Sequence, residues 1–163
     1  MKIAVLSDIH DHTTHLLLAL EAAREAGCVR MIYLGDMVRS NTLTTLLREW
    51  ELPLDIVIGN NEYELEIFDQ IVQGAPHATL HGDAGALEAD GKRIFFCHLP
   101  SYARRAADSG RFDAVFYGHT HCADIQMYGT VLLANPGEVL GRQSAASIGV
   151  YNTEEHHFSV FPI

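Results

Sequence analysis

The chain has 163 residues, of which 48% are hydrophobic and 20% are charged, and its formal net charge is -10 at pH 7 with histidine neutral. This composition supports a buried core and excludes an intrinsically disordered chain, and the negative charge argues against nonspecific binding to nucleic acid or to an anionic membrane. The three cysteines, Cys28, Cys97 and Cys122, have no paired spacing, and the N-terminus has no long apolar leader, so we expect a cytoplasmic protein with free thiols and no membrane-spanning segment.

Strand-like and helix-like segments alternate in the first half of the chain. Apolar runs rich in branched residues, typical of buried strands, lie at 2–8, 29–36 and 54–60. Leucine and alanine on helical spacing predict a helix at 13–27, with Thr13 or Thr14 as its N-cap and Gly27 as its stop. Further helices are expected at 41–50 and 62–74. This alternation predicts a parallel sheet with crossover helices.

The second half has a different pattern. Hairpins are expected at 85–98, around the turn signal Asp90-Gly91, and at 123–137 and 144–163. A short helix at 102–110 and a buried strand at 112–121 lie between them, so this half should be mostly antiparallel. We therefore expect an α/β (mixed α+β) fold, a four-layer αββα sandwich of two mixed β-sheets flanked by helices. No linker or repeat interrupts the chain, and we expect one domain spanning 1–163.

Polar residues follow each buried strand. They are two aspartates, one asparagine and four histidines: Asp8, His10, Asp36, Asn60, His98, His119 and His121. Ligands of open α/β sheets lie beyond the carboxyl ends of the strands, so we expect these side chains to meet in one crevice. In Asp8-x-His10 and His119-x-His121, a period of two would place both side chains on one side of an extended tip.

Mixed oxygen and imidazole donors suit Mn, Fe, Ni, Co or Zn. Seven donors exceed the needs of one tetrahedral ion, and they fit two ions about 3.5–4 Å apart that share a carboxylate. The empty site would carry the negative charges of Asp8 and Asp36 and repel a phosphoester. Two divalent ions and a bridging hydroxide would bring it to about +1, so that an acidic chain binds phosphate only with metal.

The motifs "SDIH", "GD", "GN", a lone histidine after a strand and "GHTH" resemble, in order and rough spacing, those of the calcineurin-like metallophosphoesterases. The small size is similar to the compact prokaryotic phosphodiesterase branch of that family. This resemblance implies a hydrolase that cleaves a small phosphodiester at a dinuclear centre, with Mn as the favoured metal. A bridging water, converted to hydroxide, would attack phosphorus.

The family pattern also implies a role for each ligand. Asp8, His10 and His121 would hold the first ion. Asn60, His98 and His119 would hold the second ion. Asp36 would bridge the two.

Several residues depart from the family pattern. Most members have a histidine after the metal-binding asparagine, where this chain has Asn61. An amide can donate to a phosphate oxygen but cannot protonate a leaving group near neutral pH. Asn61 and His12 are nevertheless retained as catalytic candidates, His12 as a substitute proton donor, although His12 is better explained as a cap of the first helix. "NPGE" at 135–138 resembles a signature that usually ends in serine, and Glu138 at the mouth would discourage multiply charged substrates.

A second function class stays open, a non-catalytic or weakly catalytic scaffold or binding module on the same fold. A scaffold is free to lose metal ligands, and all seven positions here carry suitable types, which favours the enzyme. Exposed strand edges would also permit a homo-oligomer. The natural substrate is not readable from the sequence.

Overall fold

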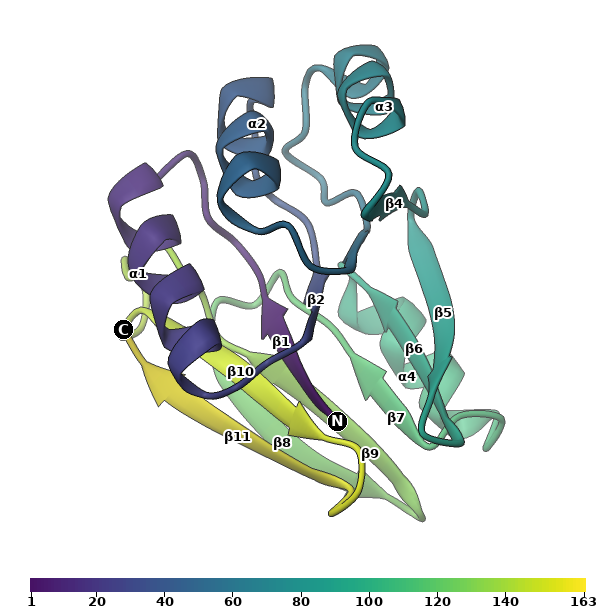
Figure 1. Ribbon diagram of the computed structural model, residues 1–163. Helices are drawn as coiled ribbons and strands as arrows, with labels where there is room; N and C mark the ends of the chain where they lie inside the picture. Colours follow the sequence, from purple (N-terminus) through teal and green to yellow (C-terminus); the bar gives the residue numbers. More distant parts are fainter.

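The computed structural model describes residues 1–163 and contains two β-sheets and four helices (Figure 1). The first sheet has the strand order β11-β10-β1-β2-β3-β4. Its strands are β1 (Lys2–Leu6), β2 (Arg30–Tyr33), β3 (Leu54–Ile56), β4 (Ala78–Leu80), β10 (Ser147–Asn152) and β11 (His157–Pro162). Strands β1 to β4 run parallel, whereas β10 is antiparallel to β1 and β11 is antiparallel to β10.

Three helices connect the parallel strands: α1 (Thr13–Glu25), α2 (Ser40–Glu49) and α3 (Leu65–Gln73). The predicted alternation of strands and crossover helices in the first half is therefore confirmed. Strand β4 was not predicted, because it has only three residues, none of which is buried, and so short a segment is a weak signal. None of the four helices is both long and apolar enough to cross a bilayer.

The second sheet has the order β5-β6-β7-β9-β8. Its strands are β5 (Ala84–Ala89), β6 (Lys92–Cys97), β7 (Ala114–Phe116), β8 (Ala123–Tyr128) and β9 (Val131–Pro136). The hairpins β5–β6 and β8–β9 are antiparallel as predicted, but β6, β7 and β9 are parallel. The expectation of a mostly antiparallel second half is thus wrong at its centre. Helix α4 (Pro100–Asp108) makes β6–α4–β7 a crossover unit, and the last hairpin, β10–β11, joins the first sheet instead.

Three apolar clusters separate the layers of the sandwich. One lies between the first sheet and α1 to α3 and contains Leu20, Leu46 and Phe68. A second lies between the two sheets, and a third lies between the second sheet and α4. Figure 1 shows α1 to α3 along one side of the molecule and α4 behind β6. The predicted order, helices, sheet, sheet, helix, is confirmed.

Helix α1 begins at Thr13 as predicted but differs in its capping residue, and α3 begins later than predicted. The N-cap of α1 is His12, whose Nδ1 accepts the backbone N–H of His15 at 3.2 Å, and not Thr13 or Thr14. Helix α3 begins only at Leu65. The acidic residues before it are used elsewhere, because Glu64 accepts the backbone N–H of Ser40 at the start of α2. At the start of α3, a side-chain contact with a separate segment of the chain therefore overrides the local helical pattern.

Candidate metal centre

The loops that follow β1, β2 and β3 meet the loops that follow β6 and β7 at one end of the two sheets. Backbone hydrogen bonds hold the first two loops together: Asp8 N–H donates to Gly35 O at 3.1 Å, and His10 N–H donates to Asp36 O at 3.0 Å. In the second sheet, Gly118 N–H donates to His98 O at 3.1 Å. The predicted crevice is thus built from strand ends of both sheets, and it contains all seven predicted ligand residues.

Asp8, His10, Asp36 and His121 form the first group of donors. Each offers one ligand atom, and these atoms lie within 4.8 Å of one another. His121 Nε2 is 3.3 Å from Asp8 Oδ1, and His10 Nε2 is 3.6 Å from Asp36 Oδ2. Asp8 Oδ1 and His10 Nε2 are buried and have no hydrogen-bond partner. Such orphaned atoms are costly in a folded protein, and a divalent cation would satisfy both, so this donor set fits a metal ion.

Asn60, His98 and His119 form the second group. Asn60 Oδ1 is 3.0 Å from His98 Nε2 and 2.8 Å from His119 Nδ1, and the two ring nitrogens are 3.2 Å apart. His98 Nδ1 contacts the Leu34 carbonyl oxygen at 2.8 Å and must donate its proton there, which leaves a lone pair on Nε2. These three atoms therefore converge with the chemistry that a second borderline ion requires.

Asp36 lies between the two groups. Its Oδ2 faces His10, and its Oδ1 is 3.5 Å from His98 Nε2. Burial by itself would raise the pKa of Asp36, but the neighbouring His98 imidazole and the hydrogen bonds from Asn61 outweigh burial and hold the pKa well below its usual range. Burial raises the pKa of Asp8, against opposing contributions from Ser7, His98 and His121. Asp36 is therefore the more firmly ionised of the two carboxylates.

The tips of the loops are not extended, contrary to the expectation from the period of two. Five of the seven donor residues have a positive φ: Asp8 (56°), His10 (45°), Asp36 (62°), His119 (69°) and His121 (59°). Residues other than glycine seldom adopt this conformation, and such strain collects at functional sites. The left-handed turns bend each tip, so the donors converge without lying on one face of a strand.

Asn61 supports Asp36 and does not project toward a substrate. Its backbone N–H donates to Asp36 Oδ1 at 2.9 Å, and its Nδ2 donates to Oδ2 at 2.6 Å. The amide is therefore already occupied, and we no longer expect it to bind a phosphate oxygen. The next residue, Glu62, also supports the loops, because it accepts the N–H groups of Met37 and Gly59 at 2.7 and 2.8 Å. Nothing in the local sequence indicated either role.

His12 is not among the grouped donors and packs against His15, with the ring centroids 3.9 Å apart and the ring planes tilted by 40°. Since its Nδ1 caps α1, only Nε2 is available for proton transfer.

Glu138 is fully buried, so its expected place at the mouth of the site is wrong. Its Oε2 lies 2.5 Å from His121 Nδ1, and its Oε1 accepts the N–H groups of Gln143 and, at 2.7 Å, of Ser144. Burial would raise the pKa of Glu138, but these hydrogen bonds outweigh burial and lower it. Glu138 is therefore an ionised carboxylate behind a metal-ligand candidate.

Two hollows adjoin the cluster. One of about 330 Å³ is lined by His10, His121, Leu140, Arg142 and Gln143, and it brings a guanidinium to the side of the first group. The other, about 110 Å³, lies beside Asn60 and His98 and is bounded by Leu99 and Tyr102, among others.

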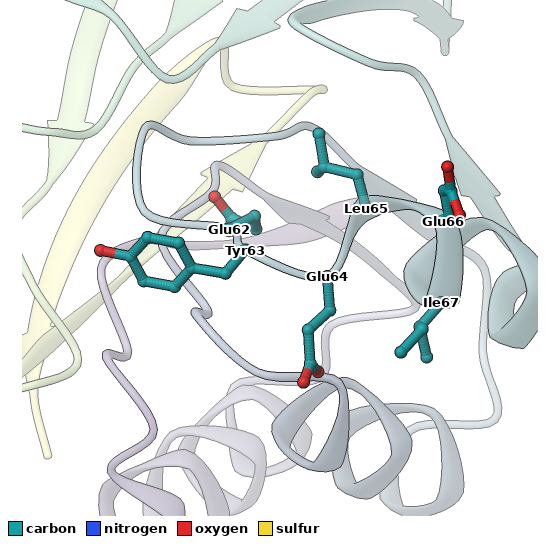
Figure 2. Close-up of a pocket in the computed structure, with 6 residues that line it drawn as sticks. All are labelled: Glu62, Tyr63, Glu64, Leu65, Glu66 and Ile67. Carbon is teal, nitrogen blue, oxygen red and sulfur yellow. The ribbon is translucent and has the colours of Figure 1, made fainter.

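A larger hollow of about 410 Å³ is lined by Glu62 to Ile67, a run of consecutive residues before and within α3 (Figure 2). Glu62, Glu64 and Glu66 contribute three carboxyl groups to its lining. Like charge disfavours an anionic ligand there, and the two smaller hollows are the ones that adjoin the donor cluster.

Comparisons with known proteins agree with this geometry. Residues 1–156 match the calcineurin-like phosphoesterase superfamily domain. The chain is 30% identical to the phosphodiesterase MJ0936 of Methanocaldococcus jannaschii over 164 residues, which cover 97% of this chain and 96% of the relative. The structure of an archaeal phosphodiesterase, 27% identical, matches over 100% of both chains with a TM-score of 0.92. The phosphoesterase Yfce of E. coli, at 19% identity, shares the fold over 100% of both chains with a TM-score of 0.70.

Proposed function

The chain belongs to the calcineurin-like phosphoesterase superfamily and is a hydrolase of phosphoester bonds, and on that premise we propose that it cleaves phosphodiesters with two divalent metal ions. The observation that carries this proposal is the position of Asp36 between two separate donor groups. Such an arrangement is what a shared bridging carboxylate requires. Because both sheets supply donors, we also treat residues 1–163 as one functional domain.

Each donor has a defined role in the proposed centre. Asp8, His10 and His121 would hold the first ion. Asn60, His98 and His119 would hold the second ion, and Asp36 would be shared by the two. When bound, the ions would supply a hydroxide nucleophile at neutral pH and neutralise charge on the phosphate. Oxygen and imidazole donors without thiolate suit Mn, Fe, Ni, Co or Zn, and among these we favour Mn because the family resemblance implies it.

The rest of the chain binds and orients. Arg142 lines the hollow beside His10 and His121, where its guanidinium can pair with a non-bridging phosphate oxygen. Asn61 fixes both oxygens of Asp36, so the bridging carboxylate cannot rotate away from either group. No side chain in the cluster is placed as a dedicated proton donor to the leaving group. Substrates whose leaving groups depart without protonation are therefore preferred.

The charge of the centre supports a diester over a monoester. The buried carboxylate of Glu138 adds a third negative charge to those of Asp8 and Asp36. Three carboxylates cancel most of the positive charge that two divalent ions bring. A centre of low net charge gives a dianionic monoester little electrostatic advantage over a monoanionic diester.

Turnover of bis(p-nitrophenyl) phosphate by metal-stripped protein, with Mn²⁺, Ni²⁺, Co²⁺ or Zn²⁺ added in turn, tests the proposal. We expect hydrolysis that depends on added metal and exceeds that of p-nitrophenyl phosphate. Absence of turnover with all four metals would favour the scaffold.

Two ligand variants test the assignment of the donors. Asp36→Asn should weaken the binding of both ions, whereas His119→Ala should weaken mainly one. Metal content measured by mass spectrometry should therefore fall further in the first variant. Equal and undiminished content in both would remove the assignment.

A further inference from the structure

The carboxylate of Glu138 joins a metal-ligand candidate to the loop behind it. Oε2 meets His121 Nδ1 at 2.5 Å, and Oε1 accepts backbone N–H groups from Gln143 and Ser144. Ser144 Oγ in turn donates to the backbone carbonyl of His121 at 2.6 Å. His121 is therefore held at its ring by Glu138 and at its backbone by Ser144. Of these four residues, only His121 is a donor, and it belongs to the first donor group.

An ionised carboxylate can only accept hydrogen bonds, so His121 must present Nδ1–H to Glu138. The neutral imidazole then has its lone pair on Nε2. That nitrogen is the one that lies 3.3 Å from Asp8 Oδ1, inside the donor group. Hydrogen bonds from an imidazole to a carboxylate fix the orientation of a ligand and raise its basicity.

We propose that Glu138 is a positioning residue for the first metal ion, which it serves by fixing the tautomer and the direction of the His121 ring. This inference rests on the proposed function, since it assigns His121 to that ion. It gives a physical reason for a glutamate at the end of "NPGE", a position where the family signature usually has serine. A serine hydroxyl can donate or accept, so it would leave the tautomer open.

Glutamine is the informative replacement because it keeps the size of the side chain. With its carbonyl oxygen toward Gln143 and Ser144, its amide can only donate to His121 Nδ1, which forces the ring proton onto Nε2. With the amide flipped, the NH₂ group of the glutamine faces the backbone N–H groups of Gln143 and Ser144, and donors then meet donors. The first orientation keeps the loop contacts but reverses the hydrogen bond to His121, and the second loses the loop contacts, so Glu138→Gln cannot reproduce both contacts of the carboxylate.

The tautomer can be measured without any metal. We expect ¹⁵N NMR of the metal-free wild type, at about pH 8 where imidazole is mostly neutral, to show His121 protonated at Nδ1. Glu138→Gln should shift the proton to Nε2 or give a mixture. A wild-type His121 protonated mainly at Nε2 would overturn the inference, and this result does not depend on how well any variant folds.

Metal titration provides the second readout. Of the two Mn²⁺ binding phases, Glu138→Gln should weaken one by about 10- to 100-fold and leave the other unchanged. Asp55→Asn is the matched control, because Asp55 is a buried carboxylate 2.8 Å from His81 Nε2 and outside the cluster. Its Mn²⁺ affinity should equal that of the wild type.

The two failures are distinguishable. If wild type and Glu138→Gln bind Mn²⁺ equally, the positioning role is wrong while the centre stands. If the wild type shows the expected tautomer and no Mn²⁺ binding, the proposed function is wrong while Glu138 still orients the ring.

Discussion

The two carboxylates of the cluster are oriented by hydrogen bonds from neighbouring residues. Asp36 is the clearest case, since Asn61 donates to both of its oxygens. Asp8 is a second case, because its Oδ2 accepts from Ser7 Oγ at 2.5 Å and from His119 N–H at 3.0 Å. Each carboxylate therefore presents a defined edge to the centre. Supporting contacts of this kind decide ligand geometry as much as the ligands themselves.

The support of Asp36 by Asn61 can be tested directly. Asn61→Ala removes the Nδ2 donor and keeps the backbone N–H, so we expect Mn²⁺ affinity and diester turnover to fall by about 10-fold or more. Asn41→Ala, an exposed position in α2, is the control and should behave as the wild type. Unchanged metal affinity in Asn61→Ala would show that Asp36 needs no such support.

The buried carboxylate of Asp8 lowers the free energy of unfolding of the metal-free protein at neutral pH. Because burial raises its pKa above the unfolded value, the stability that its protonated form provides is complete at low pH and is lost as pH rises through the folded pKa. Asp8→Asn, measured in chelator, should therefore be more stable than the wild type at neutral pH, on the order of 1 kcal/mol. Urea unfolding checks this.

The difference in the free energy of unfolding between Asp8→Asn and the wild type should vanish below about pH 4, where the Asp8 carboxyl is protonated in the folded and the unfolded state. Mn²⁺ should stabilise the wild type more than it stabilises Asp8→Asn, because the variant keeps only the donors of the second ion intact. A less stable Asn variant at pH 7 without metal would contradict the cost assigned to Asp8.

At the scale of elements, strand ends and glycines position the donors. Gly59, at the end of β3, packs against the Asp36 loop, and a Cβ built at Gly59 would collide with the Asp36 carboxylate. A Cβ built at Gly118, after β7, would likewise collide with the Ser7 side chain. Glycine is required here for close approach, not for a positive φ, since neither residue adopts one.

Gly59→Ala should therefore displace Asp36 and reduce the metal content of the purified protein by more than half, with a fold that circular dichroism still recognises. Gly74→Ala is the matched control, because its Cβ would meet only ordinary contacts. Full metal content in Gly59→Ala would show that the loop can shift without loss of the centre.

The sequence predicts which side chains meet at the loop tips better than it predicts the elements that hold them. Buried strands that end in Asp, Asn or His are visible as local patterns, which explains why all seven predicted ligand residues lie in one crevice. The left-handed tips and the late start of α3 depend on contacts between loops far apart in the chain. The parallel centre of the second sheet likewise depends on β9, which forms a hairpin with β8 and also pairs in parallel with β7. No local pattern contains that information.

At the scale of the whole molecule, the two sheets meet at the donor cluster. Asn60 comes from the first sheet, and His98 and His119 come from the second. Ions bound there would therefore link the two sheets, and the free energy of metal binding would add to the free energy of unfolding. This also explains why an acidic chain can process an anionic substrate, since the local charge depends on what the cluster holds.

The central claim, a pair of ions held by one shared carboxylate, is tested most directly by anomalous X-ray diffraction from crystals soaked in Mn²⁺. We predict two anomalous peaks about 3.5–4 Å apart. One should lie against Asp8, His10 and His121, the other against Asn60, His98 and His119, and Asp36 should contact both. A single peak, or peaks away from these side chains at saturating Mn²⁺, would contradict the account.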